Sequence, residues 1–296
     1  MKKETIAAVV VTYNRKDLLK ECLDSLLKQT QKLDSIIIMD NASSDGTKDM
    51  LKKEYLSNKI FDYVNLGKNL GGAGGFHYGI KRAYEKGFDW IWVMDDDALP
   101  LKNCLKNLSK KFNKNNIISP IKINKKEEIQ TDHFGNISKH LFLFKSVKSI
   151  KEDIKIDFTS FVGPIFKKNV IKSVGYPNKK FFIWADDFEY CIRLKNKRFK
   201  ILLTPFAKII HEEGFISKYE FTWKNFYGWR NKIFIRKKYL NKFFYFIYLV
   251  YFTTYILMQI LFFKKEKKKF LKLYFKSLNR AINSNFIVKK NPKDVF

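Results

Sequence analysis

Three consecutive aspartates, Asp95, Asp96 and Asp97, directly follow the largely apolar run 88–94. If that run is a buried strand, the three carboxylates lie at the carboxyl edge of a sheet, where open α/β sheets bind ligands. Neighbouring carboxylates repel one another unless a cation neutralises them, and hard divalent ions are bound by carboxylate oxygens. An isolated acidic triplet is more often a solvated turn, but the preceding strand and the basic character of the whole chain favour a metal site.

A second acidic cluster, Asp186 and Asp187 with Glu189, stands at the start of a helix predicted over 188–194. Trp184 and two phenylalanines precede it. Such an apolar wall raises the pKa of a carboxyl group, which suits a general base. Acidic residues in a first helical turn are equally common as partners of the helix dipole. The cluster is therefore a candidate catalytic site with a purely structural alternative.

Four glycines, Gly71, Gly72, Gly74 and Gly75, punctuate a loop that is expected after the third strand. Glycine-rich loops let backbone amides approach phosphate groups, and a following helix N-terminus favours negative charge. The spacing matches neither a dinucleotide-binding fingerprint nor a Walker loop, so a tight turn is the commoner explanation. The neighbourhood of Asp40 and the aspartate triplet favours a role in phosphate binding.

A single histidine, His211, follows the largely apolar run 207–210. A lone histidine at a strand end is more often structural than a ligand. It would complete a metal site of carboxylates and imidazole only if the fold brings it to Asp97.

These candidates need a scaffold, and the first hundred residues predict one. Apolar runs at 6–11, 35–39, 63–66 and 88–94 have the composition of buried strands, and each is separated from the next by a stretch long enough for a helix. Such alternation predicts an α/β fold with a mostly parallel sheet and helices on both faces. The Lys- and Asn-rich segment 113–156 is expected to form loops and edge strands.

Composition limits the class of partner. The 296 residues include 58 Lys and Arg against 29 Asp and Glu, a net charge of +29. Charge of this size implies an anionic partner such as nucleic acid, an anionic membrane or a phosphorylated substrate. Three widely spaced cysteines, Cys22, Cys104 and Cys191, favour a reduced cytosolic compartment. The apolar run at 6–11 is too short for a signal peptide.

The C-terminal region is aromatic and basic. Residues 243–263 carry no charge and are long enough to cross a bilayer, with Lys242 and Lys264 at their ends. The segment 267–282 places basic residues on one face and aromatic residues on another, which is typical of helices that lie on anionic membranes. We expect monotopic attachment to a membrane surface. A membrane-spanning helix and a helical hairpin at a homo-oligomer interface are the alternatives.

Several of these motifs occur together in one known family. The segments 9–15 and 40–47, the aspartate triplet and the pair Asp186 and Asp187 resemble the family-two inverting glycosyltransferases of GT-A fold, over roughly residues 5–235. The resemblance implies a GT-A fold, a Rossmann-like mixed and mostly parallel sheet, with a C-terminal helical extension that associates with a membrane.

Within the family, the segments 69–76, 95–98 and 184–190 look most like the galactofuranosyltransferases. Rhamnosyltransferase relatives usually carry Asn-Pro-Asp, or a similar variant, in place of three aspartates. One departure is Ala185, which separates Trp184 from the following Asp pair and bears on the acceptor side of the site.

The resemblance also implies a role for each matched residue. Asp187 would be the catalytic base, and Asp186 would orient the acceptor hydroxyl. Asp95, Asp97 and His211 would bind a divalent metal ion, Mn2+ or Mg2+. The donor nucleotide would be bound by Thr12, Asn14, Arg15, Asp40, Asn69, Gly71, Gly72 and Asp96.

The expected domains are a GT-A catalytic domain over 1–215 and a helical region over 216–296 for the acceptor and the membrane. The expected activity is metal-dependent, inverting transfer of galactofuranose from its UDP donor to a lipid-linked or cell-surface glycan, at the inner face of the cell membrane. Rhamnosyl transfer from dTDP-rhamnose is the alternative within the class. A nucleic-acid-binding protein is the alternative outside it, but the sequence shows no recognised binding module, so no nucleic-acid partner is expected. A nucleotidyltransferase would show a glycine-rich pyrophosphorylase signature near residue 12, which is absent from the sequence.

Overall fold

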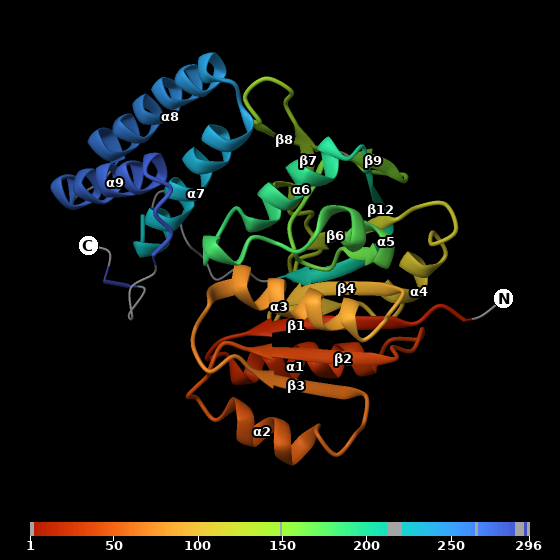
Figure 1. The fold of residues 1–296 in the computed structure, drawn as a ribbon. Coiled ribbons are helices and arrows are strands. Elements are labelled where there is room, and N and C mark those ends of the chain that lie inside the picture. The colour runs from red at the N-terminus through yellow and green to blue at the C-terminus, as the bar shows by residue number, and fades with distance from the viewer. Residues whose placement is uncertain (1–2, 149, 212–220, 264–265, 288–292, 295–296) are drawn as a thin grey trace.

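The computed structural model describes residues 3–148, 150–211, 221–263, 266–287 and 293–294. Its body is a mixed sheet of nine strands in the order β3-β2-β1-β4-β11-β6-β12-β5, with β9 paired to β12 and a small sheet ordered β10-β7-β8. Three helices near the C-terminus pack together at one side of this body (Figure 1). The predicted α/β architecture is confirmed, whereas the domain boundary expected at 215–216 lies outside the described residues.

The N-terminal half of the sheet is the predicted alternation of strand and helix. Strand β1 pairs in parallel with β2 and β4, and β2 pairs in parallel with β3. Buried β-branched runs suit strands that are covered on both faces. The elements are β1 (Ile6–Thr12), α1 (Lys16–Leu27), β2 (Ser35–Asp40), α2 (Thr47–Glu54), β3 (Phe61–Asn65), α3 (Gly71–Glu85) and β4 (Trp90–Asp95).

Alternate residues of β1 enter two cores on opposite faces of the sheet. Ala7 and Val9 pack in a core that includes α3 and α6, whereas Ala8 and Val10 pack in a core that includes α1. Each larger aliphatic side chain that is fully buried contributes about 1.5–3 kcal/mol. The two cores make the sheet edge a rigid platform for the loops that follow its strands.

The C-terminal half of the sheet is mixed. Strand β6 pairs in parallel with β12 and antiparallel with β11, whereas β5 and β9 pair antiparallel with β12. The strands are β5 (Ala98–Pro100), β6 (Ile117–Ile123), β7 (Phe134–Ile137), β8 (Phe144–Ser146), β9 (Ile154–Ile156), β10 (Phe158–Thr159), β11 (Ile165–Lys167) and β12 (Ile201–His211). The helices are α4 (Cys104–Ser109), α5 (Lys168–Val174) and α6 (Asp186–Asn196), with 3-10 turns at Thr131–His133 and Lys179–Phe181.

The expectation of loops and edge strands over 113–156 is wrong for part of that segment. Strand β6 lies inside the sheet, and all its residues are buried, Lys122 included. The Lys122 ammonium donates to Ser119 Oγ and Thr159 Oγ1, both at 2.8 Å, so its polar end is satisfied within the core. Because lysine is rarely buried, Lys122 made this central strand look like a surface strand in the sequence.

The C-terminal helices are α7 (Trp223–Tyr239), α8 (Lys242–Phe263) and α9 (Lys267–Ile282). Among the described residues, α8 has the one stretch long and apolar enough to cross a membrane, Lys242–Phe262, a test that core helices of soluble proteins also pass. One stripe of α8 packs into a third core with α7 and α9, and it comprises Tyr248, Phe252, Ile256 and Ile260. The opposite face leaves large apolar side chains exposed, namely Phe243, Phe246, Val250, Tyr251, Tyr255, Met258, Leu261 and Phe262.

Candidate active site

Neighbouring strands of the parallel half end together at one edge of the sheet. Thr12 is in register with Asp40 across β1 and β2, and Val11 with Asp95 across β1 and β4. The carboxyl ends of adjacent parallel strands form a crevice in which such sheets bind ligands. The fold therefore brings the predicted donor-side and metal-side residues to one edge.

A hydrogen-bonded network joins the β1 loop to the aspartate triplet. Thr12 Oγ1 donates to Asp96 Oδ2 at 2.7 Å. Arg15 Nη1 lies 3.2 Å from Asp96 Oδ1 and 2.6 Å from Asp97 Oδ2, so one guanidinium bridges two carboxylates. The Arg15 side chain is 44% exposed, whereas Asp96 and Asp97 are buried. This places a partly accessible positive charge at the mouth of the crevice.

Asp40 is placed in the wall of the crevice. It is fully buried, and its two oxygens accept from Ser43 N and Tyr63 OH, both at 2.8 Å. Asn14, with a φ of 52°, joins the same loop: its backbone N–H donates to Ser43 Oγ and its Oδ1 accepts from Ser44 N. Asp40 and Asn14 thus shape the loop after β2.

His211 meets Asp97 because β12 pairs with β5 and sets His211 opposite Ala98. His211 Nε2 lies 3.3 Å from Asp97 Oδ1, yet that oxygen is buried without a hydrogen-bond partner among the described residues. An orphaned carboxylate oxygen beside an imidazole fits the donor chemistry of a divalent-ion site. No group of three or more potential ligands in the described part of the chain is already arranged around a common point.

The three aspartates differ in their affinity for protons. Burial raises the pKa of Asp95 well above its ordinary value, and the carboxylates of Asp97, Asp96 and Asp186 raise it further. Burial likewise raises the pKa of Asp96 to about 6. For Asp97 burial acts in the same direction, but His211 and Arg15 lower the pKa below its ordinary value overall. Asp97 is therefore the member of the triplet that stays charged most readily.

The second acidic pair opens α6. Asp186 is buried and Asp187 is half-buried. Burial, followed by repulsion from Asp187, raises the pKa of Asp186 to about 8. Burial also raises the pKa of Asp187 to about 6, against the opposing effects of His133 and Lys122. The influence of Asp186 on Asp95 shows that the two acidic clusters lie within electrostatic reach of each other.

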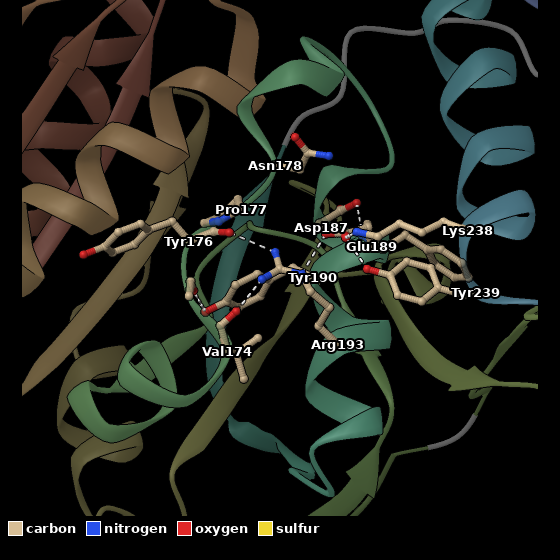
Figure 2. Close-up of polar contacts among 12 residues, drawn as sticks. Val174, Tyr176, Pro177, Asn178, Asp187, Glu189, Tyr190, Arg193, Lys238 and Tyr239 are labelled. Carbon is tan, nitrogen blue, oxygen red and sulfur yellow. Dashed lines mark hydrogen bonds and ion pairs between the residues drawn. The ribbon is translucent and has the colours of Figure 1, made fainter. Parts of the chain in front are cut away.

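Glu189, one turn into α6, has a different environment. Figure 2 shows its carboxylate between Arg193 of the same helix and Lys238 and Tyr239 of α7. Arg193 Nε lies at 3.0 Å and Lys238 Nζ at 3.2 Å, the Tyr239 hydroxyl donates as well, and Glu189 is only 1% exposed. A buried carboxylate with three partners is suited to packing α6 on α7, and it is a poor proton acceptor for a substrate.

The glycines expected in a loop after β3 lie within α3, which begins at Gly71. Gly71 has a φ of 70°, and a Cβ there would lie 2.0 Å from the Phe182 carbonyl oxygen. Its N–H donates to Asn69 Oδ1 at 2.8 Å, and Ala73 N donates to the Phe182 oxygen at 3.1 Å. Gly71 is thus required by the close approach of the segment that precedes α6.

Sequence reasoning missed two buried residues close to the predicted site residues. The His133 ring lies 4.9 Å from that of His211 in an edge-to-face arrangement, and its Nδ1 is 2.9 Å from Ser160 Oγ. Lys122 lies on β6, beside β12. Both residues fall in the segment that was expected to be loops and edge strands, so only knowledge of the β6–β12 pairing could have placed them.

A Rossmann-like sheet with an acidic triplet at its carboxyl edge, and a carboxylate pair on a nearby helix, is the arrangement of a GT-A glycosyltransferase. The chain belongs to glycosyl transferase family 2, which matches residues 7–175. It is similar in fold to a solved structure of GalNAc-T7 with UDP, GalNAc and Mn2+, at 16% identity and a TM-score of 0.66, over 96% of this chain and 58% of that one. The corresponding values for S. aureus TarS are 15%, 0.55, 92% and 43%.

Curated relatives include transferases of different sugars. The chain is 30% identical to galactofuranosyltransferase GlfT1 of Mycolicibacterium smegmatis, over 64% of this chain and 65% of that protein. It is 29% identical to galactofuranosyltransferase GlfT1 of Mycobacterium tuberculosis, over 64% of each. It is 28% identical to dTDP-rhamnosyl transferase RfbF of Shigella flexneri, over 71% of this chain and 69% of that protein. The match to the galactofuranosyltransferases spans less than two thirds of their length. The prediction of a glycosyltransferase is confirmed.

Proposed function

We propose that the protein is a metal-dependent, inverting glycosyltransferase that transfers galactofuranose from UDP-galactofuranose to a hydroxyl group of a lipid-linked or cell-surface glycan. The observations that support the proposal are the aspartate triplet at the sheet edge, which Thr12 and Arg15 bind, and the Asp186 and Asp187 pair at the start of α6, where Asp186 acts electrostatically on Asp95. One cluster is suited to a diphosphate leaving group and the other to an acceptor hydroxyl. The similarity to galactofuranosyltransferases supports the choice of sugar.

The donor nucleotide would lie along the ends of β1, β2 and β4. Arg15 supplies the partly exposed cation for the diphosphate, next to Thr12 and Asp96. Asp40 and Asn14 would act by shaping the loop that closes over the nucleoside, because their polar atoms are used within the protein. Gly71 and Gly72, with Asn69, would form the facing rim at the start of α3.

The acceptor would approach from α6. With a pKa of about 6, Asp187 is deprotonated at neutral pH and can take the proton of the attacking hydroxyl. With a pKa of about 8, Asp186 is protonated there and can donate a hydrogen bond to that hydroxyl. Attack on the sugar face opposite the leaving diphosphate gives inversion in a single displacement.

Asp97, His211 and Asp95 would hold a divalent ion, Mn2+ or Mg2+. Their donor set of carboxylate oxygens and imidazole fits such an ion, and the lack of a hydrogen-bond partner for Asp97 Oδ1 supports the assignment. A bound ion would neutralise charge on the diphosphate. Arg15 holds the other Asp97 oxygen and so fixes the carboxylate for this purpose.

The test is donor turnover by the purified full chain, with glycan acceptors and Mn2+ or Mg2+ present. We expect UDP release and galactofuranosyl product from UDP-galactofuranose, identified by mass spectrometry. Transfer from dTDP-rhamnose alone would contradict the proposal and support the rhamnosyltransferase alternative, which the similarity to RfbF favours. Tight binding to RNA or DNA without nucleotide-sugar turnover would contradict both.

We also propose that α8 and α9 attach the enzyme to the inner face of the cell membrane without crossing it. One stripe of α8 is already buried against α7 and α9, so the helix can offer only its outer face to lipid. That face carries exposed aromatic residues, and basic residues lie on the neighbouring α9. Apolar burial combined with attraction to anionic headgroups is the energetics of interfacial helices.

Phe243→Ser combined with Phe246→Ser and Phe262→Ser tests this attachment, because these three side chains are 65–69% exposed and contribute little to the fold. Sedimentation with vesicles of phosphatidylglycerol and phosphatidylcholine should fall at unchanged melting temperature. The matched control is Phe206→Ser, which replaces a phenylalanine that is 60% exposed on the body. A triple variant that forms a smaller oligomer and binds vesicles normally would indicate a protein interface instead.

A further inference from the structure

The segment that leads into the Asp186 and Asp187 pair has an unusual backbone. Phe182, Trp184 and Ala185 have positive φ values of 68°, 63° and 66°. Phe182, with a ψ of −68°, forms a three-residue γ-turn in which Ile183 N donates to the Phe181 oxygen at 2.9 Å. Non-glycine residues persist in such conformations only where neighbouring structure holds them.

Two buried side chains of α7 hold this segment. Asn231 Nδ2 lies 3.0 Å, 3.1 Å and 2.8 Å from the carbonyl oxygens of Phe181, Ile183 and Trp184. Arg230 Nη2 donates to the Phe181 oxygen at 2.9 Å. Arg230 Nε donates to Asn231 Oδ1 at 3.0 Å, which fixes the orientation of the amide. We refer to this pair as the Arg230–Asn231 clamp.

The choice of arginine is not explained by packing. Arg230 is 0% exposed, and no carboxylate of the described residues lies within ion-pair distance of it. Its guanidinium lies between the rings of Tyr227 and Phe286, at 5.0 Å and 4.9 Å from their centroids. A buried charge without a counter-ion is costly, and an apolar residue of similar size would fill the space at less cost. We therefore attribute the choice of arginine to the hydrogen bond that its guanidinium donates to the carbonyl oxygen of Phe181.

The clamp also determines where Trp184 lies. Its indole packs on Gly228 of α7, where a Cβ would approach Trp184 Cε3 to 2.8 Å. The side chain is nevertheless 40% exposed. From the other side, Ala73 N of α3 donates to the Phe182 oxygen. The segment is therefore held between the helix at the donor rim and α7.

We propose that Arg230 and Asn231 are positioning residues, which hold Phe181–Ala185 in the conformation that presents Trp184, Asp186 and Asp187 to the acceptor. The roles of Asp186 and Asp187 rest on the proposed function. Neither Arg230 nor Asn231 is placed against substrate. Both act through the backbone that precedes α6, so their loss should change acceptor use and leave donor binding intact.

Arg230→Met is the sharpest variant because stability and catalysis should then move apart. The substitution removes a buried charge that has no carboxylate partner, which favours stability, but it also removes two hydrogen bonds and two ring contacts, so the melting temperature should change little. Loss of the Arg230 bonds to the Phe181 oxygen and to the Asn231 amide should loosen the segment and lower kcat/KM for the acceptor by about tenfold or more, since displacements of about 1 Å can cost about a hundredfold. The Kd for UDP with Mn2+ should stay within about twofold of wild type.

Asn231→Asp is the second variant. It keeps the size of the side chain and the acceptor for Arg230 but removes the donors to three carbonyls. The matched control is Asn225→Asp on the same helix, where Oδ1 accepts from Thr222 N and a carboxylate can do the same. Only Asn231→Asp should lose acceptor kcat/KM.

Acrylamide quenching of the fluorescence of Trp184 measures how accessible this side chain is, and so reports on the conformation of the segment without an activity assay. Trp90 and Trp92 are 0% exposed and Trp229 is 4% exposed, whereas Trp223 on α7 is half-buried. Trp184→Phe, made in the wild type and in each clamp variant, therefore separates the signal of Trp184 from that of Trp223. Both clamp variants should change this quenching. Wild-type quenching and wild-type acceptor kcat/KM in both variants would overturn the proposal. If the wild-type enzyme turns over neither donor, the proposed function fails. The quenching then tests by itself whether Arg230 and Asn231 hold the segment.

Discussion

The two sides of the crevice are built in different ways. On the donor side, polar residues directly follow regular strands and are tied to one another, as Thr12 and Arg15 are to Asp96. On the acceptor side, a segment with three positive φ values is held by Asn231, about fifty residues further along the chain. The donor side thus depends on sheet register, and the acceptor side depends on side chains from a distant helix.

The largest effect is expected on the acceptor side. Asp187→Asn should lower turnover at least about a hundredfold, because an amide cannot accept the proton of the acceptor hydroxyl. UDP and metal binding, measured by calorimetry, should remain. In the wild type, kcat should rise with pH through about 6, where Asp187 loses its proton.

Two outcomes would contradict this assignment. Near wild-type turnover of Asp187→Asn would place the base elsewhere, and loss of UDP binding would move Asp187 to the donor side. Asp186→Asn is the matched comparison. It should raise the acceptor KM more than it lowers kcat, because its expected role is orientation.

On the donor side, Asp97→Ala should weaken metal-dependent UDP binding about 10- to 100-fold. The variant should remain folded, since removal of one carboxylate also relieves repulsion within the triplet. Calorimetric titration of UDP with and without Mn2+ measures the effect. If the dependence on the ion is the same as in wild type, Asp97 is not a ligand.

Gly71→Ala tests the contact between the two sides. The added Cβ would collide with the Phe182 carbonyl, and the positive φ adds backbone strain, so we expect a loss of about 1–3 kcal/mol in the free energy of unfolding. Gly67→Ala is the matched control, since Gly67 has a φ of 71° and open space around its Cβ position. Chemical denaturation should show a larger loss for Gly71→Ala. Equal losses would mean that backbone strain accounts for the whole effect.

The smallest effect concerns Lys122, beneath the crevice. Burial lowers its pKa from 10.5 to about 7. Between these values the unfolded chain binds a proton that the folded protein has released, so this group makes stability rise with pH, by at most about 1.4 kcal/mol per pH unit. Lys122→Met lacks this dependence. The difference in stability between this variant and the wild type at pH 7 should therefore shift in favour of the wild type by pH 10. A constant difference in melting temperature, like that expected for exposed Lys126→Met, would show that Lys122 is charged in the fold.

The strand ends that carry Thr12, Asp40 and Asp95 could be predicted from sequence because their signals are local. Buried runs followed directly by Thr12, Asp40 and Asp95 predict both the strands and the edge at which they end. The approach of His211 to Asp97 could be stated only as a condition, because it depends on the antiparallel pairing of β12 with β5.

Other parts of the site were less predictable for physical reasons. Lys122 disguised β6, and the glycines of α3 were assigned to a loop although their small size serves packing within a helix. The residue types around Phe182 do not predict a positive φ, because side chains of α7 impose that conformation.

Helix α7 has a practical consequence for anyone who prepares this protein. A fragment that ends at residue 215, the boundary expected from sequence, would lack the clamp and the two α7 partners of Glu189, Lys238 and Tyr239. Such a fragment should bind nucleotide yet transfer sugar poorly. A fragment that ends after Tyr239 would keep the hydrogen bonds of both sets while omitting α8, α9 and the Phe286 ring that packs on Arg230. A fragment for expression and crystallisation should therefore extend to the end of α7. The apolar α7 side chains that α8 and α9 cover in the full chain should then be replaced by polar ones.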